Sequence, residues 1–216
     1  MTISFRFLLV FFAALLFASP LAAQDPLEKL KPQTFALGVQ SGFVSTWAYE
    51  PTQATKSKDD FGVTHCSWNQ PYYLFGESAG EIDTFVRSLN TAGNLGLEQQ
   101  APAWRQTYGC NPLPTPLDVE AWRNATQIKI SRQSEVLGKA YGLGVNIGIA
   151  EAQASMGQSR RPIVVNALQN TLIHAVALGL DVKELNKVIS LTDTTTPMAE
   201  IHDKILWIRT TYQALM

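Results

Sequence analysis

The sequence predicts an all-α protein, a bundle of five to seven helices with an irregular or short-β region that a disulfide holds. Three observations predict this class. Apolar residues recur at helical spacing through most of the chain. Proline and Ser, Thr or Asp mark several helix starts. No run of regularly spaced strands is present in the sequence.

Residues 1–23 have the pattern of a secretory signal peptide. Arg6 precedes an apolar run at 7–17, and the small-residue segment ASPLAA follows at 18–23. The apolar run is too short to cross a bilayer. We therefore expect cleavage after Ala23, a periplasmic or secreted location, and one helical domain over 24–216 with no stable membrane span.

The charge balance argues against a nucleic-acid partner. The formal net charge is −1 at pH 7, whereas electrostatic binders of nucleic acid or anionic membranes carry a basic excess or cluster. The one locally basic pair, Arg160 and Arg161, falls in a predicted turn between helices. We expect no nucleic-acid partner and no cofactor.

The first third of the chain mixes helical and irregular signals. Residues 34–49 show both a four-residue and a two-residue apolar period, and we favour helix over strand. Around 50–77 and 92–114 the chain is rich in polar residues, Pro and Gly, which predicts loops. Between them, Ser78 and Glu81 match a capping box that would start a helix.

Two cysteines occur, Cys66 and Cys110, without CxxC spacing. In an exported protein they predict one disulfide. A metal site, with His65 beside Cys66, is the alternative, but a second pair of ligands at usable spacing is missing from the sequence. We therefore expect no metal. An aromatic run follows Cys66 and is a candidate interaction surface or, alternatively, a cluster packed under the disulfide loop: Trp68, Tyr72, Tyr73 and Phe75.

The second half of the chain is more clearly helical. Thr115 and Pro116 start a helical span that is long for a globular domain, so we expect a break between Ile130 and Gly142. Further helices start near Pro162, Asp181 and Pro197. The last helix carries one apolar stripe, made of Met198, Ile201, Ile205, Ile208, Tyr212 and Leu215. The sequon at Asn124 lies in a predicted helix, which argues against its glycosylation.

The stretch GLGVNIG, at 142–148, superficially resembles a dinucleotide-binding loop. The third glycine is one place late, however, and the preceding residues are helix-prone and not strand-like. In a helix, Gly144 and Gly148 project toward the centre of the buried face. The similar hexapeptide LGVQSG contains Gly38 and Gly42, and we predict that these two glycine faces pack on each other.

Catalytic signals are sparse. The sequence contains neither an HExxH motif nor a GxSxG elbow. The candidates that remain are Glu151, His174, His65 and Asp83. Glu151 projects toward the buried side of its helix, where a carboxylate must be paired or neutral. We expect Arg160 or Arg161 to fold back to it.

The absent motifs favour a non-enzymatic exported protein that binds a protein partner, such as an inhibitor, immunity or assembly-accessory protein. A hydrolase or other envelope enzyme remains the alternative, if the scattered candidates converge in one cleft within hydrogen-bond reach. Carriage of a small molecule inside the bundle is a third possibility. It would require a sizeable cavity.

Overall fold

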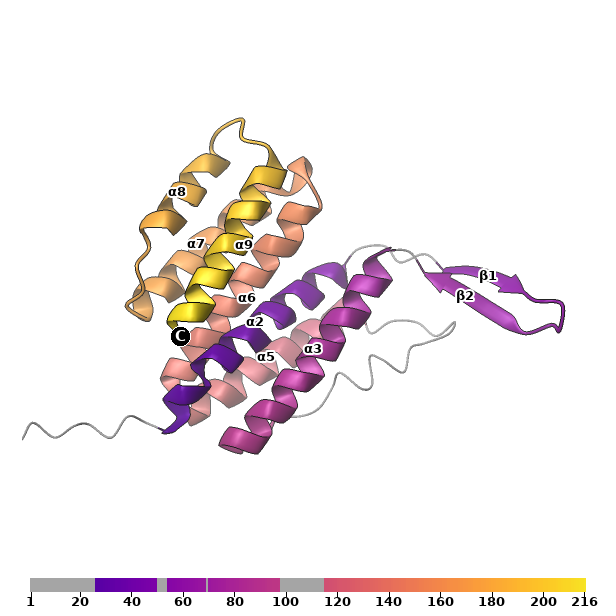
Figure 1. Ribbon diagram of the computed structural model, residues 1–216, viewed down its shortest axis with the longest axis horizontal. Helices are drawn as coiled ribbons and strands as arrows, with labels where there is room; N and C mark the ends of the chain where they lie inside the picture. The colour runs from indigo at the N-terminus through magenta and orange to yellow at the C-terminus, as the bar shows by residue number, and fades with distance from the viewer. Residues whose placement is uncertain (1–25, 50–53, 69, 98–114) are drawn as a thin grey trace, which may run out of the picture.

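The computed structural model describes residues 26–49, 54–68, 70–97 and 115–216, which fold mainly into α-helices (Figure 1). A short 3-10 turn, η1 (Pro26–Leu30), leads into α2 (Lys31–Trp47). A two-stranded antiparallel hairpin, β1 (Ala54–Lys58) and β2 (Thr64–Trp68), precedes α3 (Gln70–Gly93). The remaining elements are α5 (Pro116–Gln133), α6 (Glu135–Ser155), η2 (Gln158–Arg160), α7 (Arg161–Ala177), α8 (Lys183–Thr192) and α9 (Met198–Leu215).

The helical fold class is confirmed, and so is the favoured helical assignment for 34–49, of which 34–47 belong to α2. The predicted break in the long helical span lies at Ser134. This residue is extended, with φ −156° and ψ 125°, and its hydroxyl accepts a hydrogen bond from the backbone N–H of Leu137 at 3.4 Å. Thr115 caps α5 through a capping box with Asp118.

The predicted capping box at Ser78 and Glu81 is wrong, because α3 begins two turns earlier, at Gln70. Pro71 lies in the first turn of this helix, where its missing N–H has no intrahelical partner to lose. The irregular segment predicted at 50–77 therefore contains a hairpin and the start of a helix. The predicted apolar stripe of the last helix is wrong at Leu215, which ends α9 and is 58% exposed.

Two helices, α2 and α6, form the centre of the bundle. On one side they pack against α3 and α5, and on the other side α6 packs against α7 and α9 (Figure 1). Each central helix contributes side chains to both halves of the core. Leu37 and Tyr141 belong to the half near α3 and α5, whereas Phe35 and Ile147 belong to the half near α7, α8 and α9.

Four glycines bring the backbones of α2 and α6 together. A Cβ atom placed on Gly38 would lie 2.2 Å from the carbonyl O of Tyr141, and one placed on Gly42 would lie 2.1 Å from the carbonyl O of Val145. In the reverse direction, a Cβ on Gly144 or Gly148 would lie 2.2 Å from the Phe35 carbonyl O and 2.0 Å from that of Val39. The two glycine pairs therefore meet at one contact, which no larger residue could occupy without separating the helices.

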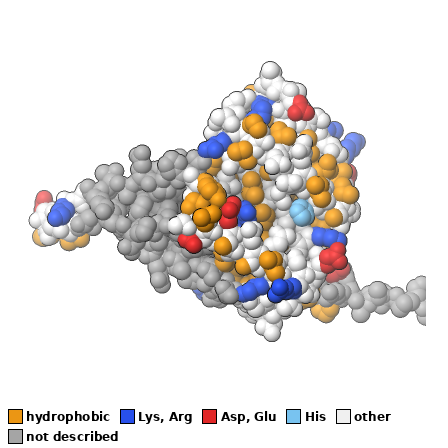
Figure 2. All heavy atoms as spheres, turned by 180° about the vertical axis from the view of Figure 1, so that it is seen from behind, with side chains coloured by type: hydrophobic (Ala, Val, Ile, Leu, Met, Phe, Trp, Pro, Cys, Tyr) orange, Lys and Arg blue, Asp and Glu red, His pale blue; other side chains and the backbone are white. Residues whose placement is uncertain are grey.

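Among the described residues, no helix combines the length and the apolar character that a membrane crossing requires. Seen from behind, the helical body carries basic and acidic side chains singly or in small groups between hydrophobic ones (Figure 2). The described part of α7 contributes three large exposed apolar side chains, Ile163, Ile173 and Val176.

Candidate functional site

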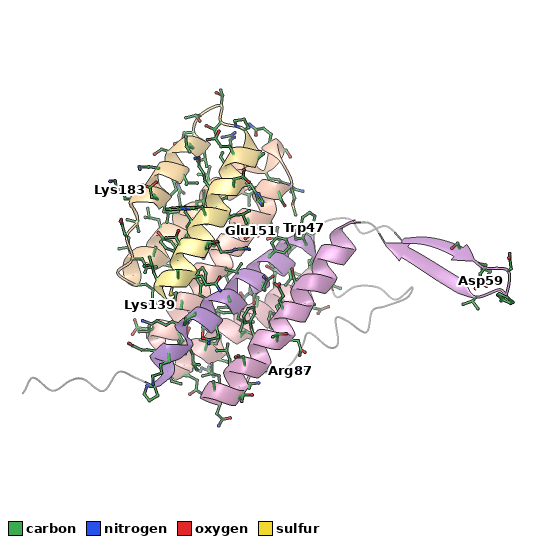
Figure 3. All side chains as sticks on the ribbon, viewed as in Figure 1. Trp47, Asp59, Arg87, Lys139, Glu151 and Lys183 are labelled. Carbon is green, nitrogen blue, oxygen red and sulfur yellow. The ribbon has the colours of Figure 1, made fainter. Side chains whose placement is uncertain are left out.

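A buried ion pair joins the central helix α6 to the last helix, α9. Glu151 is 7% exposed, and both of its carboxylate oxygens accept hydrogen bonds from Nη1 of Arg209 at 2.8 Å. Figure 3 shows Glu151 inside the helical body, between these helices. Burial raises the pKa of Glu151, and the charges of Arg209 and His202 act in the opposite direction. Neither Arg160 nor Arg161 is the partner, contrary to the prediction, and Arg161 instead donates to the carbonyl oxygens of Thr192 and Thr196.

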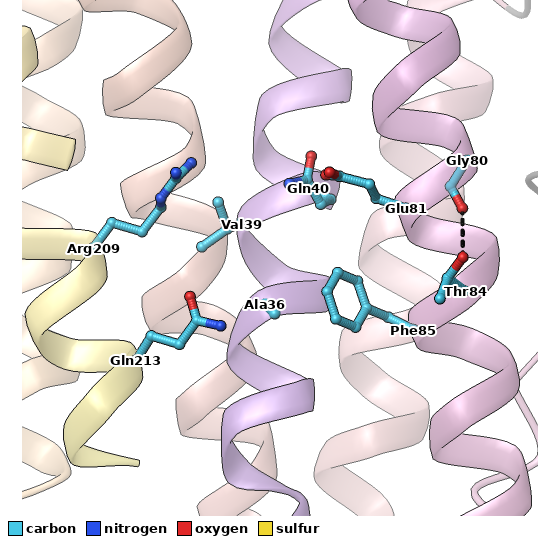
Figure 4. A pocket seen from close by; sticks show the side chains of 9 residues that line it. All are labelled: Ala36, Val39, Gln40, Gly80, Glu81, Thr84, Phe85, Arg209 and Gln213. Atoms are coloured by element: carbon cyan, nitrogen blue, oxygen red, sulfur yellow. Dashed lines mark hydrogen bonds between the residues drawn. The ribbon is translucent and has the colours of Figure 1, made fainter.

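The ion pair opens onto a cleft above α2, with α3 on one side and α9 on the other (Figure 4). The main cavity has a volume of about 580 Å³, and a smaller hollow of about 150 Å³ adjoins it at the ion pair. Arg209 lines both cavities. The main cavity is lined by Ala36, Val39, Gln40, Gly80, Glu81, Thr84, Phe85, Arg209 and Gln213.

Helical periodicity explains why these residues meet. Ala36, Val39 and Gln40 lie on one face of α2, at spacings of three and four residues. On α9, Arg209 and Gln213 are four residues apart and point toward α3. Figure 4 shows Glu81 and Phe85 pointing back from α3. The cleft thus has polar side chains on both walls, and its α2 floor combines Ala36 and Val39 with the polar Gln40.

Arg209 has hydrogen-bonding capacity beyond its bonds to Glu151. Both bonds use Nη1, so the N–H groups of Nε and Nη2 have no acceptor among the described residues. The Arg209 side chain is 32% exposed, which leaves these donors accessible from the cleft. A planar guanidinium with unused N–H groups is suited to bind a carboxylate.

The structure does not bring the predicted catalytic candidates together. Glu151 lines the cleft, whereas His174 on α7 packs against α6 at Gly142. Asp83 is buried in α3 and pairs with Arg87. Among the described residues, no hydrogen bond joins any two of these three candidates. The side chain of His65, the fourth candidate, lies outside the described part of the structure.

His174 packs at the contact between α6 and α7. A Cβ atom on Gly142 would lie 2.8 Å from its Cε1 atom, so the imidazole occupies the space that this glycine leaves open. Burial lowers the pKa of His174 because desolvation disfavours the charged imidazolium. The described residues contain no group of three or more side chains placed to hold a metal ion.

The predicted disulfide and aromatic surface fall largely outside the described residues. Cys110 is not described, and only the backbone of Cys66, opposite Lys56 in the hairpin, is placed. No disulfide is found among the described residues, so this bond stays a prediction. The side chains of the predicted surface are also not described; their backbone lies at the end of β2 and in the first turns of α3, at Trp68, Tyr72, Tyr73 and Phe75.

The hairpin projects away from the helical body, with Asp59 at its far end (Figures 1 and 3). Asp59 Oδ1 accepts hydrogen bonds from the backbone N–H groups of Phe61 at 3.0 Å and Val63 at 2.8 Å. The backbone N–H of Asp59 donates to the Val63 carbonyl at 3.1 Å. Gly62 has φ +76°, a conformation that a side chain would disfavour. This hydrogen-bonded tip presents Phe61, which is 91% exposed.

Neither the hairpin tip nor most of the cleft was predicted from the sequence. The segment KDDFG, at 58–62, contains the Asp and Gly that favour a tight turn. In ATKSK, at 54–58, lysines alternate with Thr and Ser, as the two faces of an exposed strand would. Those two signals could have identified the hairpin. For the cleft, the position of Arg209 off the apolar stripe of the last helix was a signal. The pairing of Arg209 with Glu151, 58 residues away in the sequence, could not be predicted from local spacing.

A second hollow, of about 800 Å³, lies between α8 and α9. Its walls carry the ion pairs Lys187–Glu184 and Lys204–Glu200, and Trp207, 54% exposed, stands at its edge. These cations are already paired, and the apolar side chains of Val188, Leu191 and Trp207 line the same groove. The groove has no buried polar group comparable to Glu151 and Arg209 among its described lining residues.

Comparison of the chain with protein-family models, curated proteins and solved structures found no match.

Proposed function

We propose that this protein is an exported, non-enzymatic helical protein that binds a protein partner. The observation that carries the proposal is the hairpin tip, where a hydrogen-bonded turn presents Phe61 at 91% exposure, away from the helical body. Aromatic residues, Phe among them, are enriched in protein–protein interfaces relative to the rest of the surface. A tip already held by hydrogen bonds loses little conformational entropy when it docks.

The arrangement of the acidic candidates supports binding over catalysis. Both oxygens of Glu151 accept from Arg209, and Asp83 pairs with Arg87. A general acid or base must reach the substrate proton directly or through one water. These carboxylates are engaged in interhelical or intrahelical ion pairs and have no second titratable partner within hydrogen-bond distance among the described candidates.

Replacement of Phe61 by alanine should weaken partner binding about tenfold or more, because the lost aromatic contact is of hot-spot size. The side chain packs against little of its own chain, so the free energy of unfolding should stay unchanged. The measurement is quantitative affinity capture of the tagged protein from its own exported fraction, followed by titration of the recovered partner against purified variants.

Leu117→Ala is the matched control, because Leu117 is 73% exposed on α5. This variant should bind the partner as the wild type does. Equal binding by Phe61→Ala and the wild type would contradict the proposed role of the tip. Recovery of no specific partner would contradict the protein-binding function.

Signal-peptide cleavage and disulfide formation can be tested separately on the mature chain. If residues 1–23 are a signal peptide and Cys66 and Cys110 form a disulfide, intact mass spectrometry should show a chain beginning at Gln24 that lacks both thiol hydrogens. Treatment with a reductant should restore those hydrogens and expose two alkylatable thiols. A chain retaining residues 1–23, or thiols that alkylate without reduction, would contradict the respective proposal.

A further inference from the structure

We infer that the groove between α8 and α9 binds a basic amphipathic helix of a partner protein. The groove consists of two adjoining hollows, of about 800 Å³ and about 130 Å³, that share Glu184 and Trp207 in their linings. It lies apart from the hairpin tip (Figure 1). The groove is therefore a second interaction surface, and its occupant does not depend on the role proposed for Phe61.

Trp207 is the largest apolar side chain that the bundle leaves exposed on α9. The face of α9 that packs into the core is formed by buried residues, namely Ile201, Ile205, Ile208 and Tyr212. Trp207 lies outside this stripe, is 54% exposed, and lines both hollows. The bundle thus covers less than half of this residue, whereas tryptophan is among the residues that most often dominate binding energy at interfaces.

Apolar residues continue the surface on both sides of Trp207. Val188 and Leu191 from α8 line the larger hollow, and Leu215, 58% exposed, lines the smaller one at the end of α9. From Glu200 to Leu215, both of which line the groove, α9 is about 22 Å long. A helix of about 14 residues, or about four turns, has this length.

The two walls of the groove are helices, so a third helix can pack against both. Side-chain ridges of one helix fit the grooves of another at interaxial distances of roughly 8 to 10 Å. The backbone N–H and C=O groups along α8 and α9 are used within each helix, so an added strand would find no free sheet edge. The arrangement therefore supports recognition of a helix in a groove.

The charges around the groove favour a basic occupant. Each of the two lysines in the lining pairs with a glutamate. Asp181 and Asp203 also line the groove, and neither pairs with a lysine or arginine in the described part of the chain. The Asp203 side chain is 81% exposed, with Nδ1 of His202 3.9 Å from its carboxylate. A lysine or arginine of the occupant would complement this surplus of negative charge.

The same charges disfavour a second copy of this chain as the occupant. A two-fold symmetric contact places the same patch of both copies face to face, so the negative surplus of one groove would meet that of the other. An amphipathic helix with apolar residues on one face and Lys or Arg beside them instead complements both the apolar lining and the two aspartates.

A designed peptide tests this inference by fluorescence anisotropy. The labelled peptide has about 14 residues, with leucines at helical spacing and an equal number of lysines between them. It should bind the full chain saturably, with a Kd below about 100 µM. Two comparison peptides should bind about tenfold more weakly: one has glutamate in place of lysine, and one alternates leucine and lysine strictly, which favours a strand. Weaker binding of the first peptide, or equal binding of a comparison peptide, would overturn the inference.

Two variants locate the peptide in the groove. Trp207→Ala should weaken binding about tenfold or more, whereas Leu117→Ala, at a position 73% exposed on α5, should not weaken it. Asp203→Lys should weaken binding about fivefold. Asp60→Lys, at an exposed position of the hairpin, makes the same change in net charge and should leave binding unchanged.

Equal effects within either pair of variants would overturn the inference, provided that circular dichroism shows them folded. The comparison of the three peptides uses the wild type, so it stands if a variant fails to fold. Sedimentation velocity identifies the alternative occupant. Trp207→Ala should leave the oligomeric state unchanged, and a wild-type dimer that this variant dissociates would also overturn the inference.

Peptide binding is independent of the proposed role of the hairpin tip. Phe61→Ala should bind the peptide as the wild type does, because the tip does not line the groove. Loss of partner capture in this variant, with peptide binding retained, would separate the two surfaces. A failure of either surface can therefore be recognised without reference to the other.

Discussion

Replacing Gly148 with alanine is expected to destabilise the protein by about 2 to 3 kcal/mol, even though alanine favours helix by about 1 kcal/mol. The new Cβ would lie 2.0 Å from the Val39 carbonyl O and 2.9 Å from the Phe43 N. Both are backbone atoms of α2, so no side-chain rotation relieves the overlap. The two central helices must separate, and contacts in both halves of the core weaken.

Gly142→Ala is the matched control for this prediction. It lies on the same helix and gains the same helix propensity, but its Cβ would meet side-chain atoms of His174 and Gln127, at 2.8 and 3.1 Å. Side chains can move, so we expect a change within about 1 kcal/mol. The measurement is the free energy of unfolding from urea titration. A Gly148→Ala protein as stable as Gly142→Ala would contradict the close backbone contact.

Removing the partner of the buried carboxylate should have the second large effect. Arg209→Met leaves Glu151 buried without its guanidinium, and we expect a loss of about 2 to 3 kcal/mol in the free energy of unfolding. This loss is at or below the lower end of the roughly 3 to 5 kcal/mol typical of a broken buried pair, because the Arg209 side chain is 32% exposed. Arg132→Met is the control, because Arg132 is exposed and takes part in no described ion pair. It should change the free energy of unfolding by less than about 0.5 kcal/mol.

The loss in Arg209→Met should depend on pH in a defined direction. Burial already raises the pKa of Glu151, and Arg209 is the largest influence that lowers it. Without Arg209 the pKa rises further, so the folded variant binds a proton more tightly than the unfolded chain does. The variant should therefore regain stability as the pH falls through that raised pKa and lose it as the pH rises.

Urea titrations of Arg209→Met and the wild type over a series of pH values measure this dependence. The double variant Glu151→Leu with Arg209→Met removes the buried charge and should recover much of the lost stability. A stability difference that is constant with pH, or a double variant less stable than Arg209→Met, would contradict the ion-pair account.

The sequence identified the central contact because glycine spacing carries direct geometric information. Within a helix, Gly144 and Gly148 share a face, as do Gly38 and Gly42, and a helix tolerates such residues when another backbone lies close. The break at Ser134 was predictable for a similar reason, since the helical span from Pro116 exceeded the usual length. Both inferences rest on local rules.

The errors arose where one local sequence pattern is compatible with two different structures. Proline interrupts a helix at most positions but is tolerated in the first turn. Pro71 lies in the first turn of α3, so this helix starts earlier than predicted. Ser78 and Glu81 match a capping box and lie instead within that helix. Glu81 therefore faces the cleft, a role that its position in a sequence motif obscured.

The partner of Glu151 was missed because sequence proximity is a poor guide to tertiary contact. Arg160 and Arg161 are near in the chain, but the turn through η2 directs Arg161 toward the carbonyl oxygens at the end of α8 and before α9. The antiparallel return of α9 along α6 brings Arg209 to the carboxylate. That return depends on the packing of several helices, which local spacing does not encode.

Site-specific photocrosslinking from position 61 tests the proposed protein-binding function most directly. A photoreactive phenylalanine analogue replaces Phe61, or Leu117 as the control, in the full-length protein expressed in its own cells. The proposal predicts one discrete protein adduct from position 61 and none from position 117 after irradiation. No adduct from position 61, or the same set of adducts from both positions, would contradict it.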